Sequence, residues 1–235
     1  VVDLTGGSGS TTPVQIKTDG TNVFVRAFAK IFKYTVSNQQ IQDLDLSSPS
    51  FGSINSIGAF NIDANNLYYV ATQNSLTGFG TEFFKYSIGT GEKTLINICE
   101  DSVGACSGAR SGFPQDIKIK NNDIYILGGN NLTGSNEIVK INNLNNSFEI
   151  IDANKMKMGI RNNEVSYPVE HIISDGKIFF GGENNNGHIK LFVKTIGSSS
   201  DAIEVNLPTP YLDNNPMNFY QSQNYVYFGA KTAQT

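Results

Sequence analysis

The sequence predicts an all-β fold that is built from a repeated unit of four short strands. An apolar and aromatic run that follows a polar turn recurs about every 50 residues, a spacing typical of repeat architectures. The runs are "DGTNVFV", "ANNLYYV", "NNDIYIL", "SDGKIFF" and "SQNYVYF", and no segment shows the period of an amphipathic helix. The aromatic residues of these runs are Phe24, Tyr68, Tyr125, Phe179 and Tyr227.

Each unit is expected to hold four antiparallel strands. The first strands are "PVQIK", "GAFNI", "QDIKI", "EHIIS" and "MNFYQ", and the aromatic runs are the second strands. The third strands "IFKY", "FFKY", "IVKI" and "FVKT" carry Lys33, Lys85, Lys140 and Lys194 between apolar neighbours. The fourth strands "QDLDL", "TLINI", "FEIID" and "IEVNL" follow turn-forming clusters. Four short strands per repeat are typical of a β-propeller blade.

Burial gives the physical reason for stacking such units. One four-stranded sheet has two faces and cannot cover both alone, whereas neighbouring blades around an axis cover each other. The second strands are apolar at consecutive positions, as expected of a strand that is buried on both faces. The repeated lysines are expected to be structural, because their stems can cover apolar surface while their ammonium groups reach water.

One propeller domain is expected over residues 1–235. The opening "VVDL" has the pattern of a fourth strand, and the last run, "YVYFG", is a second strand, so four complete units and parts of a fifth are visible. If the ring closes on itself, the N-terminal strand completes the last blade and one third strand is missing. About five blades is the simplest count. A piece of a longer propeller with more blades is the alternative.

Two stretches, "DIYILGGNNLTGSNEIVKINNLNNSFEII" and "KIFFGGENNNGHIKLFVKTI", resemble kelch-type propeller repeats, in which a Gly-Gly pair closes the second strand. The doublets are Gly128 with Gly129 and Gly181 with Gly182. The resemblance covers nearly the whole chain in degenerate form. It departs from the kelch pattern because the first two repeats carry "RAF" and "ATQ" in place of the doublet, and because the chain has no Trp. It implies a propeller scaffold, which hosts many functions and selects none of them.

Composition excludes some partners. The net charge is −4 and no run of Lys or Arg occurs, so nucleic acid is not an expected partner. No apolar stretch approaches the roughly 18 residues that span a bilayer, so no transmembrane segment is expected. Cys99 and Cys106 lie in a Gly-rich and Ser-rich segment whose spacing fits no common metal site. They are predicted to form a disulfide, which implies an oxidising compartment, and two free thiols are the alternative.

Catalytic patterns are weak. A hydrolase triad has only His171 and His188 to draw on, and both are expected to be packing or hydrogen-bonding residues, so no catalytic or metal-binding residue is predicted. Glu164, Glu170 and Asp213 on or near the long loops leave open a pair of carboxylates for glycosidic chemistry. No cofactor is expected. The clusters "NIDANN" and "GENNNG" could hold calcium, but such clusters more often make turns.

The long connections are predicted to form the binding face. Connections from a fourth strand to the next first strand are long, and the second-to-third-strand loops "QNSLTGFGT" and "NNLTGSN" at the same end are intermediate in length. The connections from first to second and from third to fourth strand, at the opposite end, are short turns. Long loops on a rigid scaffold concentrate binding residues, and aromatic, Met and Arg side chains are common at interface hot spots. The predicted binding residues are Phe51, Arg110, Phe113, Met156, Met158, Arg161, Tyr167, Tyr211 and Asp213. The alternative is that these side chains only pin the loops to the blades.

Two functions follow from these observations. The first is a non-enzymatic binding or scaffold propeller of an exported or cell-surface protein, which recognises a protein or a glycan through the long-loop face. The second is a carbohydrate-active enzyme that uses acidic loop residues around the central channel. The first is preferred because the sequence shows loop asymmetry and lacks catalytic motifs. An extracellular, cell-surface or periplasmic location is expected.

Overall fold

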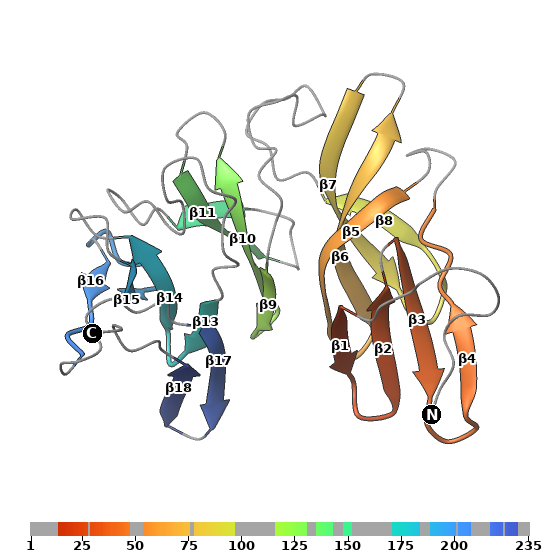
Figure 1. Cartoon of the computed structure of the whole chain (residues 1–235), viewed down its shortest axis with the longest axis horizontal. Helices are drawn as coiled ribbons and strands as arrows, with labels where there is room; N and C mark the ends of the chain where they lie inside the picture. The colour runs from red at the N-terminus through yellow and green to blue at the C-terminus, as the bar shows by residue number, and fades with distance from the viewer. Residues whose placement is uncertain are drawn as a thin grey trace, which may run out of the picture. The chain divides into compact units, whose positions relative to one another are not determined.

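Eighteen strands and no helix make up the described part of the chain in the computed structural model (Figure 1). The structure describes residues 14–27, 29–47, 54–75, 78–96, 116–130, 135–142, 148–151, 171–183, 189–200, 202–207, 217–222 and 224–229. The chain divides into two compact units, Val1–Gly108 and Ala109–Thr235, and each unit is described by itself. That residues 1–235 form one domain therefore stays a prediction.

The first unit contains two four-stranded antiparallel sheets in which strand order follows chain order (Figure 1). The strands of the first sheet are β1 (Gln15–Thr18), β2 (Asn22–Ala27), β3 (Lys30–Thr35) and β4 (Gln40–Asp43). Those of the second sheet are β5 (Ile54–Ile62), β6 (Asn66–Ser75), β7 (Gly78–Ser87) and β8 (Lys93–Ile96). Each sheet is thus a meander, the form expected of a propeller blade.

The second unit repeats this arrangement. One sheet holds β9 (Asp116–Lys120), β10 (Asp123–Asn130), β11 (Ser135–Asn142) and β12 (Phe148–Ile151). The next holds β13 (His171–Ser174), β14 (Lys177–Glu183), β15 (Ile189–Thr195) and β16 (Ile203–Glu204). The last is a hairpin of β17 (Met217–Ser222) and β18 (Tyr225–Gly229).

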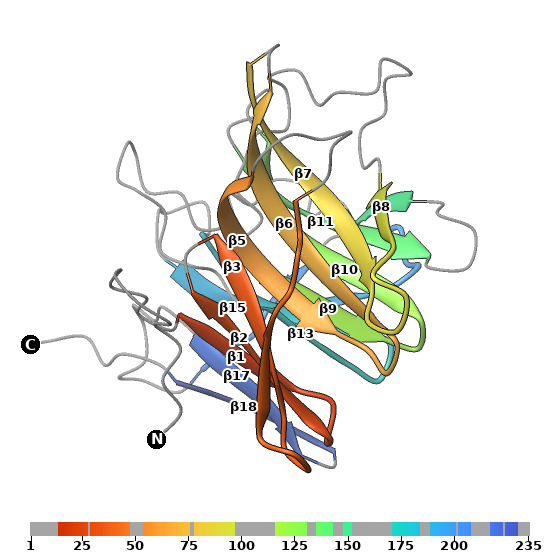
Figure 2. The ribbon, with the colours of Figure 1, turned by 90° about the vertical axis from the view of Figure 1, so that its right-hand side faces the viewer.

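Every repeated run of the sequence coincides with one of these strands, in the predicted order. The expected connection "QNSLTGFGT" between the second and third strands is mostly strand, because β6 and β7 stay paired as far as Ser75 and Gly78. Figure 2 shows this hairpin as two long, twisted strands. The predicted fourth strand at residues 1–4, and with it the closure of the last blade, lies outside the described residues.

Short polar turns join first and second strands. Asp19 accepts hydrogen bonds from the backbone N–H groups of Thr21 and Asn22, at 2.8 and 2.7 Å, and Asp63 accepts the same bond from Asn66 at 2.7 Å. Slight burial would raise the pKa of Asp19, but the hydrogen bonds from Asn22 and Thr21 outweigh it and lower the pKa to about 2. The polar groups of these turns are hydrogen-bonded within the turns, so few of their side chains remain to contact a ligand.

The second strands form the centre of each core. Residues 67–71 of β6 are all at most 1% exposed, and residues 124–127 of β10 are at most 3% exposed, which confirms burial on both faces. β18 differs, because Tyr225 is 64% and Tyr227 is 54% exposed. No described residue covers that face of the hairpin, so the expectation of two buried faces is wrong for β18.

The lysines of the third strands do not all occupy one position. Lys33, Lys85 and Lys140 lie opposite the aromatic residues of the second strands, and Lys140 pairs with Asp123 at 3.2 Å. Lys194 instead lies opposite Ile178, on the other face of its sheet, and is only 7% exposed. Its ammonium group donates to the backbone oxygens of Ser198 and Ser200 at 3.2 and 2.6 Å. Lys140 and Lys194 are therefore structural, but the alignment of Lys194 with the other lysines is off by one residue.

Polar contacts join the first strands of neighbouring sheets within each unit. The Gln15 amide donates to the Phe60 carbonyl at 3.1 Å and accepts from the Phe60 N–H at 3.2 Å, so it mimics a backbone neighbour for β5. In the second unit, Gln221 of β17 donates to the Ser174 hydroxyl of β13 at 2.9 Å. Such bonds fix the register between sheets that share no backbone ladder.

We expect Gln15→Ala to lower the free energy of unfolding by about 1–2 kcal/mol, because the Phe60 N–H and C=O lose their side-chain partner in a partly buried position. Gln42→Ala, on an exposed position of the same sheet, is the matched control and should change stability by less than about 0.5 kcal/mol. Urea unfolding measures both. Equal effects of the two substitutions would show that the contact between β1 and β5 contributes nothing specific.

Candidate functional site

A charged cluster occupies the ends of two neighbouring first strands in the second unit. Asp116 is the first residue of β9 and His171 is the first residue of β13. Both side chains are buried, His171 completely. Because the long connections 97–115 and 152–170 join the chain at these two residues, the cluster lies where the predicted binding loops meet the scaffold.

Asp116 makes three polar contacts. Its Oδ2 accepts the backbone N–H of His171 at 3.3 Å and lies 3.1 Å from the ammonium group of Lys118. The imidazole Nδ1 of His171 lies 3.2 Å from the same oxygen without the geometry of a hydrogen bond. Neither ring nitrogen of His171 has a hydrogen-bond partner among the described residues.

The carboxylate of Asp116 is held in its ionised form. Burial alone would raise its pKa, because the low-dielectric interior disfavours the charged form. The contacts with His171, and then the charge of Lys118, outweigh burial and hold the pKa of Asp116 well below its ordinary value. A carboxylate that stays charged can orient a neighbouring side chain, but it is a poor proton donor at neutral pH.

The contacts of the cluster anchor two first strands to each other. Nucleophilic catalysis would need a hydroxyl or thiol within hydrogen-bond reach of His171, and within the described ranges neither ring nitrogen makes such a bond. The same part of the chain holds no group of three or more His, Cys, Asp or Glu that could bind a metal ion. The contacts instead join β9 to β13 at the point from which the long connections depart.

The two ends of each sheet differ in their connections. In an antiparallel meander, the first-to-second and third-to-fourth turns share one end, and the other connections emerge at the opposite end. The turns are short, such as residues 121–122 and 175–176, and Asn121, Asn122 and Asp175 adopt positive φ there. The connections 152–170 and 205–216 of the second unit emerge at the other end. The strand bounds therefore confirm the expected difference in length.

The predicted binding residues cannot be placed. Phe51, Arg110, Phe113, Met156, Met158, Arg161, Tyr167, Tyr211 and Asp213 all lie outside the described residues. Cys99, Cys106 and His188 also lie outside them. The structure places only the strand ends that bear these segments, and His171 is in a buried first strand, as predicted.

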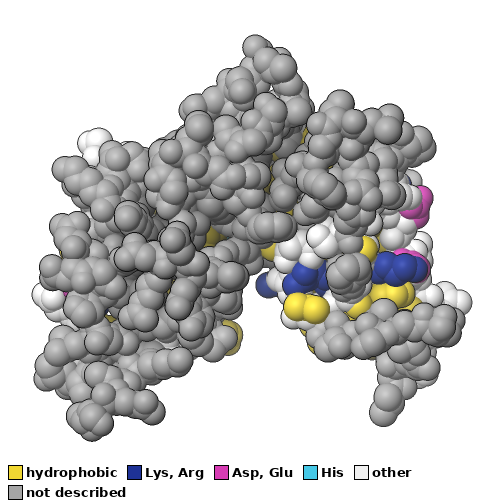
Figure 3. All heavy atoms as spheres, turned by 45° about the horizontal axis from the view of Figure 1, so that its top comes forward, with side chains coloured by type: hydrophobic (Ala, Val, Ile, Leu, Met, Phe, Trp, Pro, Cys, Tyr) yellow, Lys and Arg dark blue, Asp and Glu magenta, His cyan; other side chains and the backbone are white. Residues whose placement is uncertain are grey.

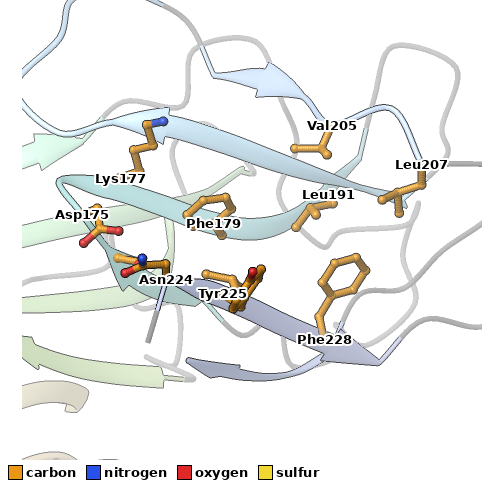
Figure 4. Close-up of a pocket in the computed structure, with 11 residues that line it drawn as sticks. Asp175, Lys177, Phe179, Leu191, Val205, Leu207, Asn224, Tyr225 and Phe228 are labelled. Carbon is orange, nitrogen blue, oxygen red and sulfur yellow. The ribbon is translucent and has the colours of Figure 1, made fainter. Parts of the chain in front are cut away.

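A groove opens between the sheet β13–β16 and the hairpin β17–β18, with a volume of about 400 Å³. Figure 4 shows Phe179, Leu191, Val205 and Leu207 on one side and Asn224, Tyr225 and Phe228 on the other. Val226 also lines the apolar part, while Ser174, Asp175 and Lys177 provide polar groups beside the strand turns. The groove is therefore mainly apolar with polar groups at one end.

Sequence reasoning missed two features of this unit. The first is the buried Asp116 at the centre of the charged cluster. Its only signal in the sequence was an acidic residue at the start of a predicted first strand. The groove could not be predicted, because "YVYFG" has the same apolar pattern as the buried second strands. Tyr220, Tyr225 and Tyr227 are exposed, and the ring centroid of Tyr227 lies 6.4 Å from that of Tyr220 and 6.3 Å from that of Tyr225, although Tyr227 was expected to be buried as a second-strand residue.

Charge is mixed on the visible surface. On the face drawn in Figure 3, the described Lys and Arg side chains lie beside acidic and apolar ones. Lys30 pairs with Asp43, and Lys93 lies 3.3 Å from Asp45, in the first unit.

Among the described residues, no helix has the length and hydrophobicity to cross a bilayer.

Comparison with known proteins identifies the fold. No family model and no curated protein sequence matches the chain. The extracellular domain of the putative hybrid two-component system BT4673 from B. thetaiotaomicron is similar to it, with a TM-score of 0.60, 10% identity, and coverage of 95% of this chain and 27% of that one. A prolyl endopeptidase structure gives a TM-score of 0.65 at 11% identity and covers 97% and 34% of the two chains. Dipeptidyl peptidase 4 of Porphyromonas gingivalis gives 0.58 at 10% identity, with 96% and 36% covered.

The chain has a β-propeller fold. The similar structures are β-propeller-like, and the four-stranded meanders of this chain are the corresponding blades. At 10 to 11% identity the likeness shows the fold alone. The chain spans about a third or less of the length of the first structures that it matches. The kelch-like character of the repeats is not confirmed.

Acid should remove the contribution of Asp116 to stability. A carboxyl whose pKa is lower in the folded than in the unfolded state stabilises the fold above its unfolded pKa of about 3.8, and this stabilisation is lost as pH falls towards the folded value. We expect Asp116→Asn to lower the free energy of unfolding by about 2 kcal/mol at pH 7. The difference from the wild type should shrink below about pH 4. Urea unfolding between pH 7 and pH 2.5 measures it, and a difference that stays constant over this range would contradict the role given to the ionised carboxylate.

Proposed function

We propose that the chain is a non-enzymatic binding module that recognises a protein or a glycan at the end of its sheets where the long connections emerge. The observation that supports this proposal is the difference in length between the connections at the two ends of each sheet. The short turns satisfy their own polar groups, as Asp19 and Asp63 do. The opposite end bears the long segments, including 152–170. Binding surfaces are commonly built from long loops on a rigid scaffold.

The contact between Asp116 and His171 supports this assignment. It fixes the strand end at which segment 152–170 rejoins the sheet, so a ligand would not have to order the scaffold as it binds. A scaffold that is ordered in advance reduces the entropy cost of association. The segment carries Met156, Met158, Arg161 and Tyr167, side chains of types that are enriched at interface hot spots.

An exported or cell-surface location is part of the same proposal. The similar BT4673 structure is an extracellular domain, which is compatible with an exported or cell-surface protein. A disulfide between Cys99 and Cys106 would fit such a compartment. The propeller scaffold itself is shared by proteins of many functions, so this support comes by analogy.

We expect Arg161→Ala and Tyr211→Ala to weaken binding to a captured ligand by about tenfold or more, the effect usual for a hot-spot side chain. The whole chain is screened on a glycan array and against extracellular proteins, and the ligand found is titrated with each variant. Lys120→Ala is the control, since it removes a positive charge from an exposed position at the end of β9 that adjoins the short turn.

Unchanged binding by both loop variants, or an equal loss with Lys120→Ala, would contradict the assignment of this face. Release of new reducing ends from a glycan by the wild-type chain would instead favour a carbohydrate-active enzyme.

A further inference from the structure

Two Asp-Gly sequences of the chain lie in short turns between a first and a second strand. Asp19 and Gly20 lie in the turn between β1 and β2, and Asp175 and Gly176 form the two-residue turn between β13 and β14. An Asp-Gly sequence can rearrange its own backbone, because the side-chain carboxyl group lies next to a peptide nitrogen that no Cβ shields. The two turns therefore allow a comparison within one chain.

Hydrogen bonds hold both reacting groups of the first turn. The Asp19 carboxylate accepts the backbone N–H groups of Thr21 and Asn22 at 2.8 and 2.7 Å, and the side chains of these two residues also donate to it, both at 2.9 Å. The N–H of Gly20 donates to the Thr18 hydroxyl at 3.0 Å. Both the carboxyl carbon and the peptide nitrogen of this turn are thus restrained.

The same bonds keep the Asp19 carboxyl group ionised. Slight burial would raise its pKa, but the bonds from Asn22 and Thr21 outweigh burial and lower the pKa from 3.8 to about 2. At pH 6 the protonated carboxyl group, which loses its hydroxyl most readily, is therefore more than about tenfold rarer at Asp19 than at an ordinary Asp.

The second turn holds neither reacting group. Asp175 and Gly176 are exposed, and among the described residues the Asp175 carboxylate and the Gly176 N–H make no hydrogen bond. The Gly176 carbonyl accepts the Ile196 N–H at 2.8 Å. Apart from its chain neighbours, no heavy atom lies within 4 Å of the position that a Cβ of Gly176 would occupy. The nitrogen of Gly176 and the side chain of Asp175 are therefore both accessible.

We propose that Asp175–Gly176 is a site of spontaneous backbone modification, at which Asp175 converts to isoaspartate while Asp19 is protected. The nitrogen of Gly176 attacks the side-chain carboxyl carbon of Asp175 and forms a C–N bond. The hydroxyl group of the protonated carboxyl leaves as water with the N–H proton, which gives a cyclic succinimide. Water then opens the ring at either carbonyl, and the product is Asp or isoaspartate. The net reaction is an isomerisation that consumes no other reactant.

Isoaspartate changes the hairpin of β13 and β14. The chain then runs through the side-chain carbon of residue 175, which lengthens the two-residue turn by one backbone carbon. This disturbs the pairing of Ser174 with Lys177 across the turn. Ser174 also accepts a hydrogen bond from Gln221 of β17 at 2.9 Å, so the modification loosens a contact between two sheets of the second unit. The inference does not depend on the function proposed above.

Incubation of the whole chain at pH 6 in water enriched in heavy oxygen measures the reaction, because each ring opening leaves one heavy oxygen atom in the chain. The protein is returned to ordinary water and digested with trypsin, which releases the two sites in separate peptides, residues 18–26 and 162–177. Fragment masses locate the heavy atom at Asp19 or Asp175. A proteinase that cleaves before Asp but not before isoaspartate then measures the isoaspartate at each site.

We expect heavy oxygen and isoaspartate to accumulate at Asp175 at least about tenfold faster than at Asp19, because the reactive form of Asp19 is rarer by that factor. Asp175→Glu keeps the charge but would have to close a larger ring, so residue 175 should gain no heavy oxygen. Thermal unfolding checks that this variant is folded. In urea that unfolds the wild-type chain, the bonds to Asp19 are lost and the two sites should react at similar rates.

Three outcomes would overturn the proposal. Equal rates at the two sites of the folded chain would show that the hydrogen bonds at Asp19 do not decide where the reaction occurs. A folded chain that gains no heavy oxygen at Asp175, although the unfolded chain does, would show that the turn itself prevents ring closure. An excess at Asp175 that is equally large in urea would assign the difference to the neighbouring sequence and not to the fold.

Discussion

The structure depends on burying the apolar second strands, which the sheets within each unit do for one another. Second strands such as β6 and β10 are apolar at consecutive positions and can be stable only where no face meets water. The pairs Tyr69 with Phe84 and Phe180 with Phe192 show how this is done, because a second strand and a third strand each contribute one ring to a common layer. The order of the strands, the spacing of the repeats and the open groove beside β18 all follow from this requirement.

Polar contacts between first strands complement this apolar packing. Apolar faces alone tolerate sliding, whereas Gln15 on Phe60, Asp116 on His171 and Gln221 on Ser174 each fix one sheet against the next. Asp116 differs from the other two because it is charged and lies at the strand ends that carry long connections. The strand ends at which the long connections 97–115 and 152–170 rejoin the sheets are thus fixed, as the proposed binding role requires.

The sequence was sufficient for the strands and insufficient for the sites. Period, turn residues and apolar runs are local properties, so the eighteen strands could be placed from them. Lys194 shows the limit of local alignment, because its register depends on which residue of β14 it faces. The burial of Asp116 and the exposure of Tyr227 depend on neighbours distant in sequence, and no local pattern encodes them. The predicted loop residues, from Phe51 to Asp213, lie outside the described residues and stay predictions.

Amide hydrogen exchange of the whole chain tests the central claim most directly, because it reports protection strand by strand. If the sheets cover one another's faces, the amides of residues 67–71 and 124–127 exchange most slowly, and those of β18 exchange much faster. Fast exchange across β6 and β10, or protection of β18 equal to theirs, would contradict this account of how the blades are stabilised.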